Sequence, residues 1–128
     1  MIFLERSFLI NYFVLTTKNH NRTVEIMKTI NEKEIAISEM VIYETLTVLR
    51  KLKQNNEKVN NVYNKLKEME VYEDKIYYEK ALDYTLVNNI GFFDNLSYVV
   101  MKNNDIKTIA SFDSDFDIFD DIKRIHLK

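Results

Sequence analysis

Acidic side chains in four separate segments are the residues of this sequence best suited to chemistry. Several carboxylates gathered in one pocket repel one another, and each raises the pKa of the others unless a cation is present. Ligation by oxygen alone favours Mg²⁺ or Mn²⁺ over zinc, so such a group would support metal-assisted hydrolysis. The four residues on which this argument rests are Glu5, Glu44, Asp94 and Asp113.

Glu44 has the most informative surroundings of the four. Its neighbours at 40–43 and 46–49 are mostly apolar, so the helix predicted here is apolar on most sides. A carboxylate in that setting costs free energy unless it is paired or bound to a metal ion. The alternative for Glu44 is an exposed position on the one polar stripe of the helix. For Asp94, the alternative is a helix N-terminal residue that caps the helix or interacts with its dipole.

The acidic stretch 113–117 has the alternating aspartates of a calcium loop, but the EF-hand pattern fails. Ile118 stands where that loop needs glycine, and Arg124 stands where its bidentate glutamate belongs. A solvated acidic turn is the alternative interpretation for Asp115. It is the preferred interpretation for the remaining aspartates, Asp117, Asp120 and Asp121.

Composition excludes several classes of protein. The 128 residues fit one domain, residues 1–128. The absence of cysteine excludes disulfides, thiolate metal sites and cysteine nucleophiles, and two histidines are too few for a histidine-rich centre. Gly91 is the only glycine, which excludes glycine-rich loops that cradle phosphates. Because the net charge is −2, a local patch or a bound metal must attract any polyanion.

The amino-terminal segment is not expected to direct the chain to or through a membrane. Glu5 and Arg6 interrupt its apolar run, and it lacks the basic start and the cleavage site of a signal peptide. No run in the sequence approaches the roughly 20 apolar residues that span a bilayer. We therefore expect a soluble, cytoplasmic protein without a membrane partner.

Short apolar runs that alternate with helical patterns predict an α/β fold. The expected strands are 2–4, 35–37, 108–112 and a closing strand at 124–127. Six helices are expected, at 7–15, around 23–30, from 38 to about 53, and at 59–69, 77–89 and 94–103. Ser38 is the expected N-cap of the third helix, and Gly91 is the expected C-terminal stop of the fifth. This alternation predicts a three-layer α/β/α domain with a short parallel sheet and helices on both faces.

The predicted fold also brings the carboxylates together. In an open parallel sheet, ligands bind at the carboxyl ends of the strands, near a reversal in strand order. Glu5 directly follows the first strand and Asp113 the strand at 108–112, while Glu44 lies in the helix that leaves the second strand. We therefore expect these residues, with Asp94, to converge on one edge of the sheet.

In order and spacing, four short segments resemble a PIN domain, and within that family the small toxin ribonucleases of the VapC type. The segments are residues 4–10 (LERSFLI), 37–44 (ISEMVIYE), 93–94 (FD) and 109–116 (IASFDSDF), and the resemblance extends over essentially the whole chain. It implies a homodimer with an acidic pocket that holds Mg²⁺ or Mn²⁺ and cleaves RNA. It also implies a cognate antitoxin protein as a partner.

The resemblance, carried over position by position, assigns roles to single residues. It places Ser7 and Ser111 as small hydroxyl residues beside the pocket. The needs of phosphodiester hydrolysis make Glu44 either a metal ligand or a base that orients water. The implied catalytic set is Glu5, Glu44, Asp94 and Asp113, and the implied metal ligands are Glu5, Asp94, Asp113 and, as an auxiliary, Asp115.

Two positions depart from the family pattern. Glu5 stands where the family has aspartate, and its extra methylene moves the carboxylate by about 1.5 Å, against a tolerance of about 0.5 Å for catalytic groups. Arg6 stands where the family has a small threonine or serine. Arg6 either points into solvent or folds over the pocket and pairs with the carboxylates. An alternative function is therefore a weakened or inactive PIN domain that binds RNA or a protein.

Basic residues that could hold RNA occur near the first helices and at the end of the helix that carries Glu44. Solvated surface is the alternative interpretation for most of them, because lysine is common at helix ends. A receiver-type signalling domain is disfavoured, because the sequence lacks an acidic pair after the first strand. The candidate RNA contacts are Arg6, Arg22, Arg50 and Lys51.

Overall fold

The strands form one parallel sheet whose order reverses at its first strand. The computed structural model describes residues 1–125. Within them, β1 (Ile2–Leu4) pairs on one side with β2 (Ile35–Ser38), which pairs with β3 (Glu70–Tyr72). On its other side β1 pairs with β4 (Thr108–Ala110), and β5 (Lys123–Arg124) completes the order β3-β2-β1-β4-β5. The strand order therefore reverses at the β1–β4 pair.

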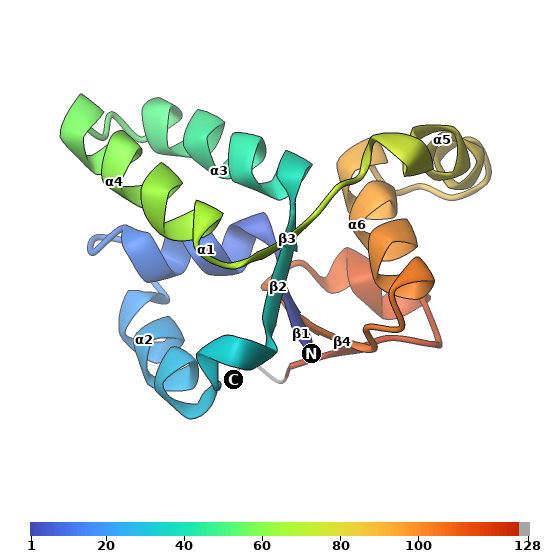
Figure 1. Cartoon of the computed structure of the whole chain (residues 1–128), viewed down its shortest axis with the longest axis horizontal. Helices are drawn as coiled ribbons and strands as arrows, with labels where there is room; N and C mark the ends of the chain where they lie inside the picture. Colours follow the sequence, from blue (N-terminus) through green and yellow to red (C-terminus); the bar gives the residue numbers. More distant parts are fainter. Residues whose placement is uncertain (126–128) are drawn as a thin grey trace.

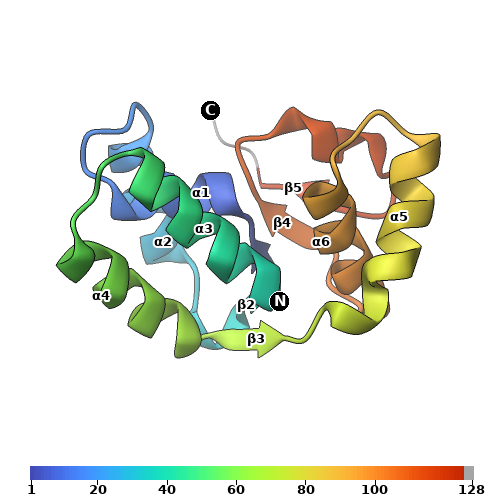
Figure 2. The ribbon, with the colours of Figure 1, turned by 90° about the horizontal axis from the view of Figure 1, so that it is seen from above.

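Helices cover both faces of this sheet (Figures 1 and 2). The connections β1–β2 and β2–β3 supply α1 (Arg6–Phe13), α2 (His20–Thr29), α3 (Glu39–Lys51) and α4 (Asn56–Lys67) on one face. The β3–β4 connection supplies α5 (Tyr78–Val87) and α6 (Phe92–Asn103) on the other. Three short 3-10 helices are η1 (Glu32–Glu34), η2 (Lys75–Tyr77) and η3 (Ser114–Ile118). The predicted three-layer α/β/α architecture is confirmed.

The central strands are apolar because helices bury both of their faces. Phe3 and Leu4, whose side chains point to opposite faces of β1, are both fully buried. Phe8 of α1 and Leu49 of α3 are fully buried on one side of the sheet, and Met101 of α6 on the other. Each such side chain contributes about 2 kcal/mol when it leaves water. This packing holds the strand ends, and so the residues that follow them, in place.

The structure corrects the predicted elements around β3 and α6. The helical stripe expected to reach residue 69 ends at Lys67, and the short, partly exposed edge strand β3 follows it. Gly91 does not end the helix before it, because α5 stops at Val87. Gly91 is instead the N-cap residue of α6, with φ of −65°, so that helix begins before Asp94.

Three further boundaries differ from the sequence predictions. The strand expected at 108–112 ends at Ala110, and α3 ends at Lys51 because Lys53 has a positive φ of 61°. The predicted closing strand appears as β5, and its predicted residues 126 and 127 lie outside the described part of the chain. Within residues 1–125, no helix combines the length and apolar character needed to cross a membrane.

Candidate active site

The reversal between β1 and β4 brings acidic residues from four elements to one edge of the sheet. Glu5 lies between β1 and α1, and Asp113 follows β4 directly before η3. Glu44 lies in the second turn of α3, on one face of the sheet. Asp94 lies in the first turn of α6, on the opposite face. In the structure these segments meet at the carboxyl ends of the strands, as predicted.

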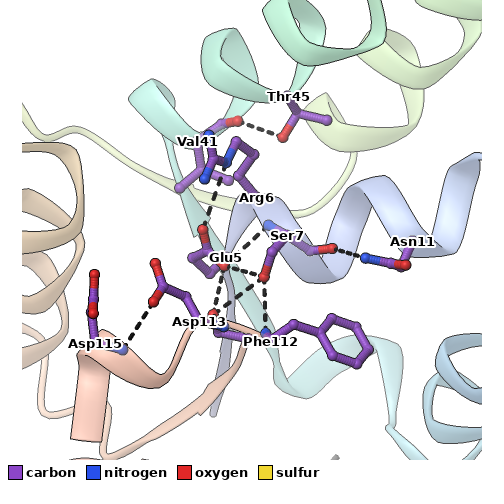
Figure 3. A network of polar contacts seen from close by, with 10 residues as sticks. Glu5, Arg6, Ser7, Asn11, Val41, Thr45, Phe112, Asp113 and Asp115 are labelled. Atoms are coloured by element: carbon purple, nitrogen blue, oxygen red, sulfur yellow. Dashed lines mark hydrogen bonds and ion pairs between the residues drawn. The ribbon is translucent and has the colours of Figure 1, made fainter. Parts of the chain in front are cut away.

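Glu5 connects β1 to the segment after β4 through two serine hydroxyls (Figure 3). Its Oε1 accepts hydrogen bonds from the Ser7 amide at 3.0 Å, from Ser7 Oγ at 2.6 Å and from Ser111 Oγ at 2.6 Å. Ser7 Oγ in turn accepts from the Phe112 amide, and Ser111 Oγ from the Asp113 amide, both at 2.9 Å. Glu5 is only 3% exposed and Ser111 is fully buried, whereas Ser7 is partly exposed, so the network is buried on the Ser111 side. It fixes the loop that carries Asp113.

Asp94, Asp113 and Asp115 come together as candidate metal ligands. One carboxylate oxygen of each lies within 4.8 Å of the other two. The Asp115 backbone amide donates to Asp113 Oδ1 at 2.9 Å, so the start of η3 fixes the Asp113 side chain (Figure 3). Three carboxylate oxygens at this spacing fit a hard divalent cation such as Mg²⁺ or Mn²⁺. Glu5 and Glu44 are not members of this set of three.

Burial and like charge destabilise the ionised form of Asp94. Burial and the charges of Glu5 and Asp113 together raise the pKa of Asp94 to about 7, while the charge of Arg6 acts against them. A cation bound beside the carboxylate would reverse this balance, because it favours the ionised form. Without a bound cation, the protein therefore compensates the negative charge of Asp94 only in part.

Asn95 fixes the position of Asp94 at the start of α6. It is fully buried, and its Nδ2 donates to the Ile90 and Gly91 carbonyl oxygens, each at 3.2 Å. Its Oδ1 accepts from Asn88 Nδ2 at 2.8 Å. These bonds join the first turn of α6 to the loop that precedes it. Asn95 was not among the predicted site residues, although an asparagine next to a candidate ligand at a helix start indicates a possible positioning role.

Glu44 is partly buried, which disagrees with the alternative of an exposed position on a polar stripe. The pKa of Glu44 is raised to about 7, and burial is the largest cause. The charge of Arg6 lowers that pKa, and the charges of Glu5 and Asp94 raise it. Glu44 thus belongs to the same electrostatic group as the other carboxylates, although it lies outside the set of three.

Asp74 is a buried carboxylate that the sequence analysis missed. It is 1% exposed, and its Oδ2 accepts a hydrogen bond from the Met40 amide at 2.8 Å. Ser38 is the N-cap residue of α3, as predicted, but its buried Oγ has no partner within the described residues. Asp74 supplies the capping hydrogen bond instead. Asp74 follows β3, and because that strand was not predicted, Asp74 was not recognised as a residue at a strand end. Its charge also raises the pKa of Glu44.

Arg6 pairs with the acidic residues instead of pointing away from them. Its Nε lies 3.8 Å from Glu5 Oε2, on the side of the carboxylate away from the two serines (Figure 3). The Arg6 side chain is 37% exposed, so it remains accessible from solvent. Of the two alternatives for Arg6, the structure has the one in which it pairs with the pocket.

The other candidate RNA contacts lie on the helices of one face. Arg22 is partly buried in α2, and Arg50 and Lys51 are exposed in the last turn of α3. Arg50 Nη2 donates to Asn56 Oδ1 at 2.7 Å, which joins the end of α3 to the start of α4. Their contact with RNA stays a prediction.

Comparisons with known proteins agree on the fold. The family model described as PIN domain matches residues 2–122. VapC20 from Mycobacterium tuberculosis, described as a sarcin-ricin loop cleaving toxin, is similar with a TM-score of 0.81 and 21% identity over 92% of this chain and 94% of that one. FitAcB from Neisseria gonorrhoeae is similar with a TM-score of 0.72 and 16% identity over 98% and 97%. No curated protein sequence matches this chain.

Proposed function

The chain belongs to the PIN domain family, and from that premise we propose that it is an endoribonuclease that hydrolyses RNA phosphodiester bonds with Mg²⁺ or Mn²⁺. The observation that carries this proposal is the approach of Asp94, Asp113 and Asp115 to within 4.8 Å of one another. All three supply oxygen, the donor that both cations prefer. When bound, the cation neutralises charge that develops on the phosphate and lowers the pKa of water.

The remaining acidic residues have different proposed roles. Glu44 orients the attacking water and accepts its proton, since a pKa of about 7 suits proton transfer near neutral pH. Glu5 remains a candidate ligand through Oε2 alone, because Oε1 already accepts three hydrogen bonds. Through Ser111 it also holds the Asp113 amide, so its first role is to position that ligand.

The proposed biological role is that of a toxin in a VapBC-type toxin–antitoxin pair, acting on RNA in the cytoplasm. The similarity of fold to VapC20, which is described as a toxin, supports this role. The partners that follow from it are the RNA substrate, a cognate antitoxin protein and a second copy of the chain. Arg22, Arg50 and Lys51 are the proposed contacts to RNA beyond the cleaved phosphate.

The nuclease proposal is tested by the metal requirement of RNA cleavage. Purified, metal-free protein is expected to leave an end-labelled single-stranded RNA intact, to cleave it when Mn²⁺ or Mg²⁺ is added, and to stop when EDTA removes the cation. DNA of the same sequence is the substrate control. Undiminished cleavage in EDTA would contradict a metal-dependent reaction. If the protein binds the RNA but does not cleave it with either Mn²⁺ or Mg²⁺, the alternative of an inactive PIN domain that binds RNA would be favoured.

Self-association is expected to use an exposed apolar surface on α5. Leu82, Leu86 and Val87 of α5 and Ile76 of η2 are all exposed, between 47% and 83% of their surface. A surface of this kind is typical of an interface. Leu86→Glu is expected to convert a dimer of about twice 15.4 kDa into a monomer, measured by sedimentation velocity, with an unchanged circular dichroism spectrum.

Leu15→Glu is the matched control for that experiment, because Leu15 is equally exposed but follows α1. It is expected to leave the dimer intact. A wild-type chain that is monomeric at all accessible concentrations, or a dimer that tolerates Leu86→Glu, would exclude α5 as the interface.

A further inference from the structure

Arg6 stands out because it places a positive charge inside a group of carboxylates. It is the first residue of α1, directly after Glu5, so the end of β1 holds its backbone at the acidic edge of the sheet. Within residues 1–125, no other lysine or arginine lies at ion-pair distance from Glu5, Glu44 or the three candidate ligands. Within the described residues, Arg6 is therefore the one basic side chain that pairs with this group of carboxylates.

Arg6 lies beside Glu5, and its charge influences both Glu44 and Asp94. It faces Glu5 Oε2, and among the charged neighbours of Glu44 it has the largest influence. Its influence on Asp94 is smaller than those of Glu5 and Asp113. By geometry, the pocket contains three aspartates that can share a cation, and Glu5, Glu44 and Arg6 lie outside that set.

The guanidinium keeps its hydrogen-bonding capacity for a ligand. Its separation of 3.8 Å from Glu5 is an ion-pair distance, longer than a hydrogen bond. Arginine carries five N–H donors in a planar arrangement that matches two oxygens of a phosphate. With 37% of the side chain exposed, these donors can reach a phosphate that enters the pocket.

From these observations we infer that Arg6 takes the place of a second divalent cation in this site. The three aspartates bind one ion, and Arg6 supplies the positive charge on the Glu5–Glu44 side, where it also binds the phosphate of the RNA. A second cation on that side would lie beside the guanidinium and be repelled by it. This inference rests on the proposed nuclease function and adds to it the number of ions and a phosphate-binding residue.

Counting bound Mn²⁺ tests the inference without reference to activity. Isothermal titration calorimetry and electron paramagnetic resonance of free Mn²⁺ are expected to give one ion per wild-type chain. Arg6→Gln is expected to bind a second Mn²⁺ on the Glu5–Glu44 side, because the repelling charge is gone. Lys33→Gln removes an exposed charge just before β2, at the opposite edge of the sheet, and is expected to bind one ion like the wild type.

RNA binding supplies the second measurement. With Mn²⁺ present, a non-cleavable RNA analogue is expected to bind Arg6→Gln about 10- to 100-fold more weakly than the wild type, the value of a charged hydrogen bond. Arg6→Lys is expected to keep one Mn²⁺ per chain and to recover only part of the RNA affinity, because lysine cannot bind two oxygens in the same plane.

The possible failures are distinguishable. A wild-type chain that binds two Mn²⁺, or an Arg6→Gln variant with unchanged Mn²⁺ stoichiometry and RNA affinity, would overturn the inference and leave the nuclease proposal standing if RNA is still cleaved. A wild-type chain that neither binds Mn²⁺ nor cleaves RNA would overturn the proposed function and the inference with it.

Discussion

Replacing Asp94 by asparagine is expected to lower metal-dependent RNA cleavage by about 100- to 1000-fold, the range for removing one group that stabilises charge in a transition state. Asp94 supplies one of the three oxygens that lie within 4.8 Å of one another. Asparagine keeps the shape of the side chain and removes its charge, so the cation loses a ligand and part of its attraction. The rate of cleavage of a labelled RNA at saturating Mn²⁺ measures the effect.

The same substitution is expected to stabilise the metal-free protein. Burial and the charges of Glu5 and Asp113 raise the pKa of Asp94 to about 7, so its ionised form is unfavourable above that pH. A neutral amide removes that repulsion, and Asp94→Asn is expected to melt at a higher temperature than the wild type at about pH 8. Slower RNA cleavage together with a higher melting temperature would show that the variant has lost a metal ligand and kept its fold.

Asp105→Asn is the matched control for Asp94→Asn. Asp105 is exposed and lies beyond the other end of α6, before β4 and away from the acidic edge. Its replacement is expected to leave both the cleavage rate and the melting temperature unchanged. Equal Mn²⁺-dependent cleavage by Asp94→Asn and the wild type would contradict the role of Asp94 as a ligand.

The layered fold was predictable because burial on both sides leaves a strong pattern. The strands at 2–4, 35–37 and 108–110 are short apolar runs, and the helices that cover them have apolar stripes. The edge strand β3 left no such pattern, since its residues are exposed or only partly buried and directly follow the apolar stripe of α4. Because this strand was not predicted, Asp74 was missed as well, although it makes the capping hydrogen bond to α3 that the Ser38 side chain was expected to make.

The convergence of Glu5, Asp94 and Asp113 was predictable from topology, because parallel strands end at one edge of the sheet. Which of them share an ion was not predictable, since that depends on side-chain hydrogen bonds. Glu5 Oε1 accepts bonds from Ser7 and Ser111, and Oε2 faces Arg6. A sequence gives the length of the Glu5 side chain, but one of the partners that orient it, Ser111, lies 106 positions away in the chain.

Thermal stability without metal is expected to fall as the pH rises from about 5 to about 8, and a divalent cation is expected to restore it. The folded-state pKa values of Glu44 and Asp94 are about 7, raised in both cases mainly by burial. In the unfolded chain, both groups titrate near their ordinary values, around 4. Between these values the folded protein binds more protons than the unfolded chain, so raising the pH through this window destabilises the fold.

The size of this effect follows from the two shifts. Each pKa unit corresponds to about 1.4 kcal/mol, but both groups are partly exposed and solvent screens part of their interaction. A combined loss of about 3 kcal/mol corresponds to a melting temperature roughly 10 °C lower at the alkaline end. The double variant Glu44→Gln/Asp94→Asn is expected to lose most of this slope, because neither amide titrates.

Adding Mn²⁺ provides the second half of the test, because the ion can neutralise the carboxylates that protons neutralise at lower pH. It is expected to raise the melting temperature of the wild type strongly at about pH 8, where the carboxylates are ionised, and weakly at about pH 5, where protons compete with the ion. The double variant, measured by the same thermal scan, is expected to show little response at either pH. A wild-type melting temperature that rises between these pH values in EDTA would mean that the two carboxylates ionise freely in the folded protein. The acidic edge would then have no unbalanced charge for a cation to neutralise.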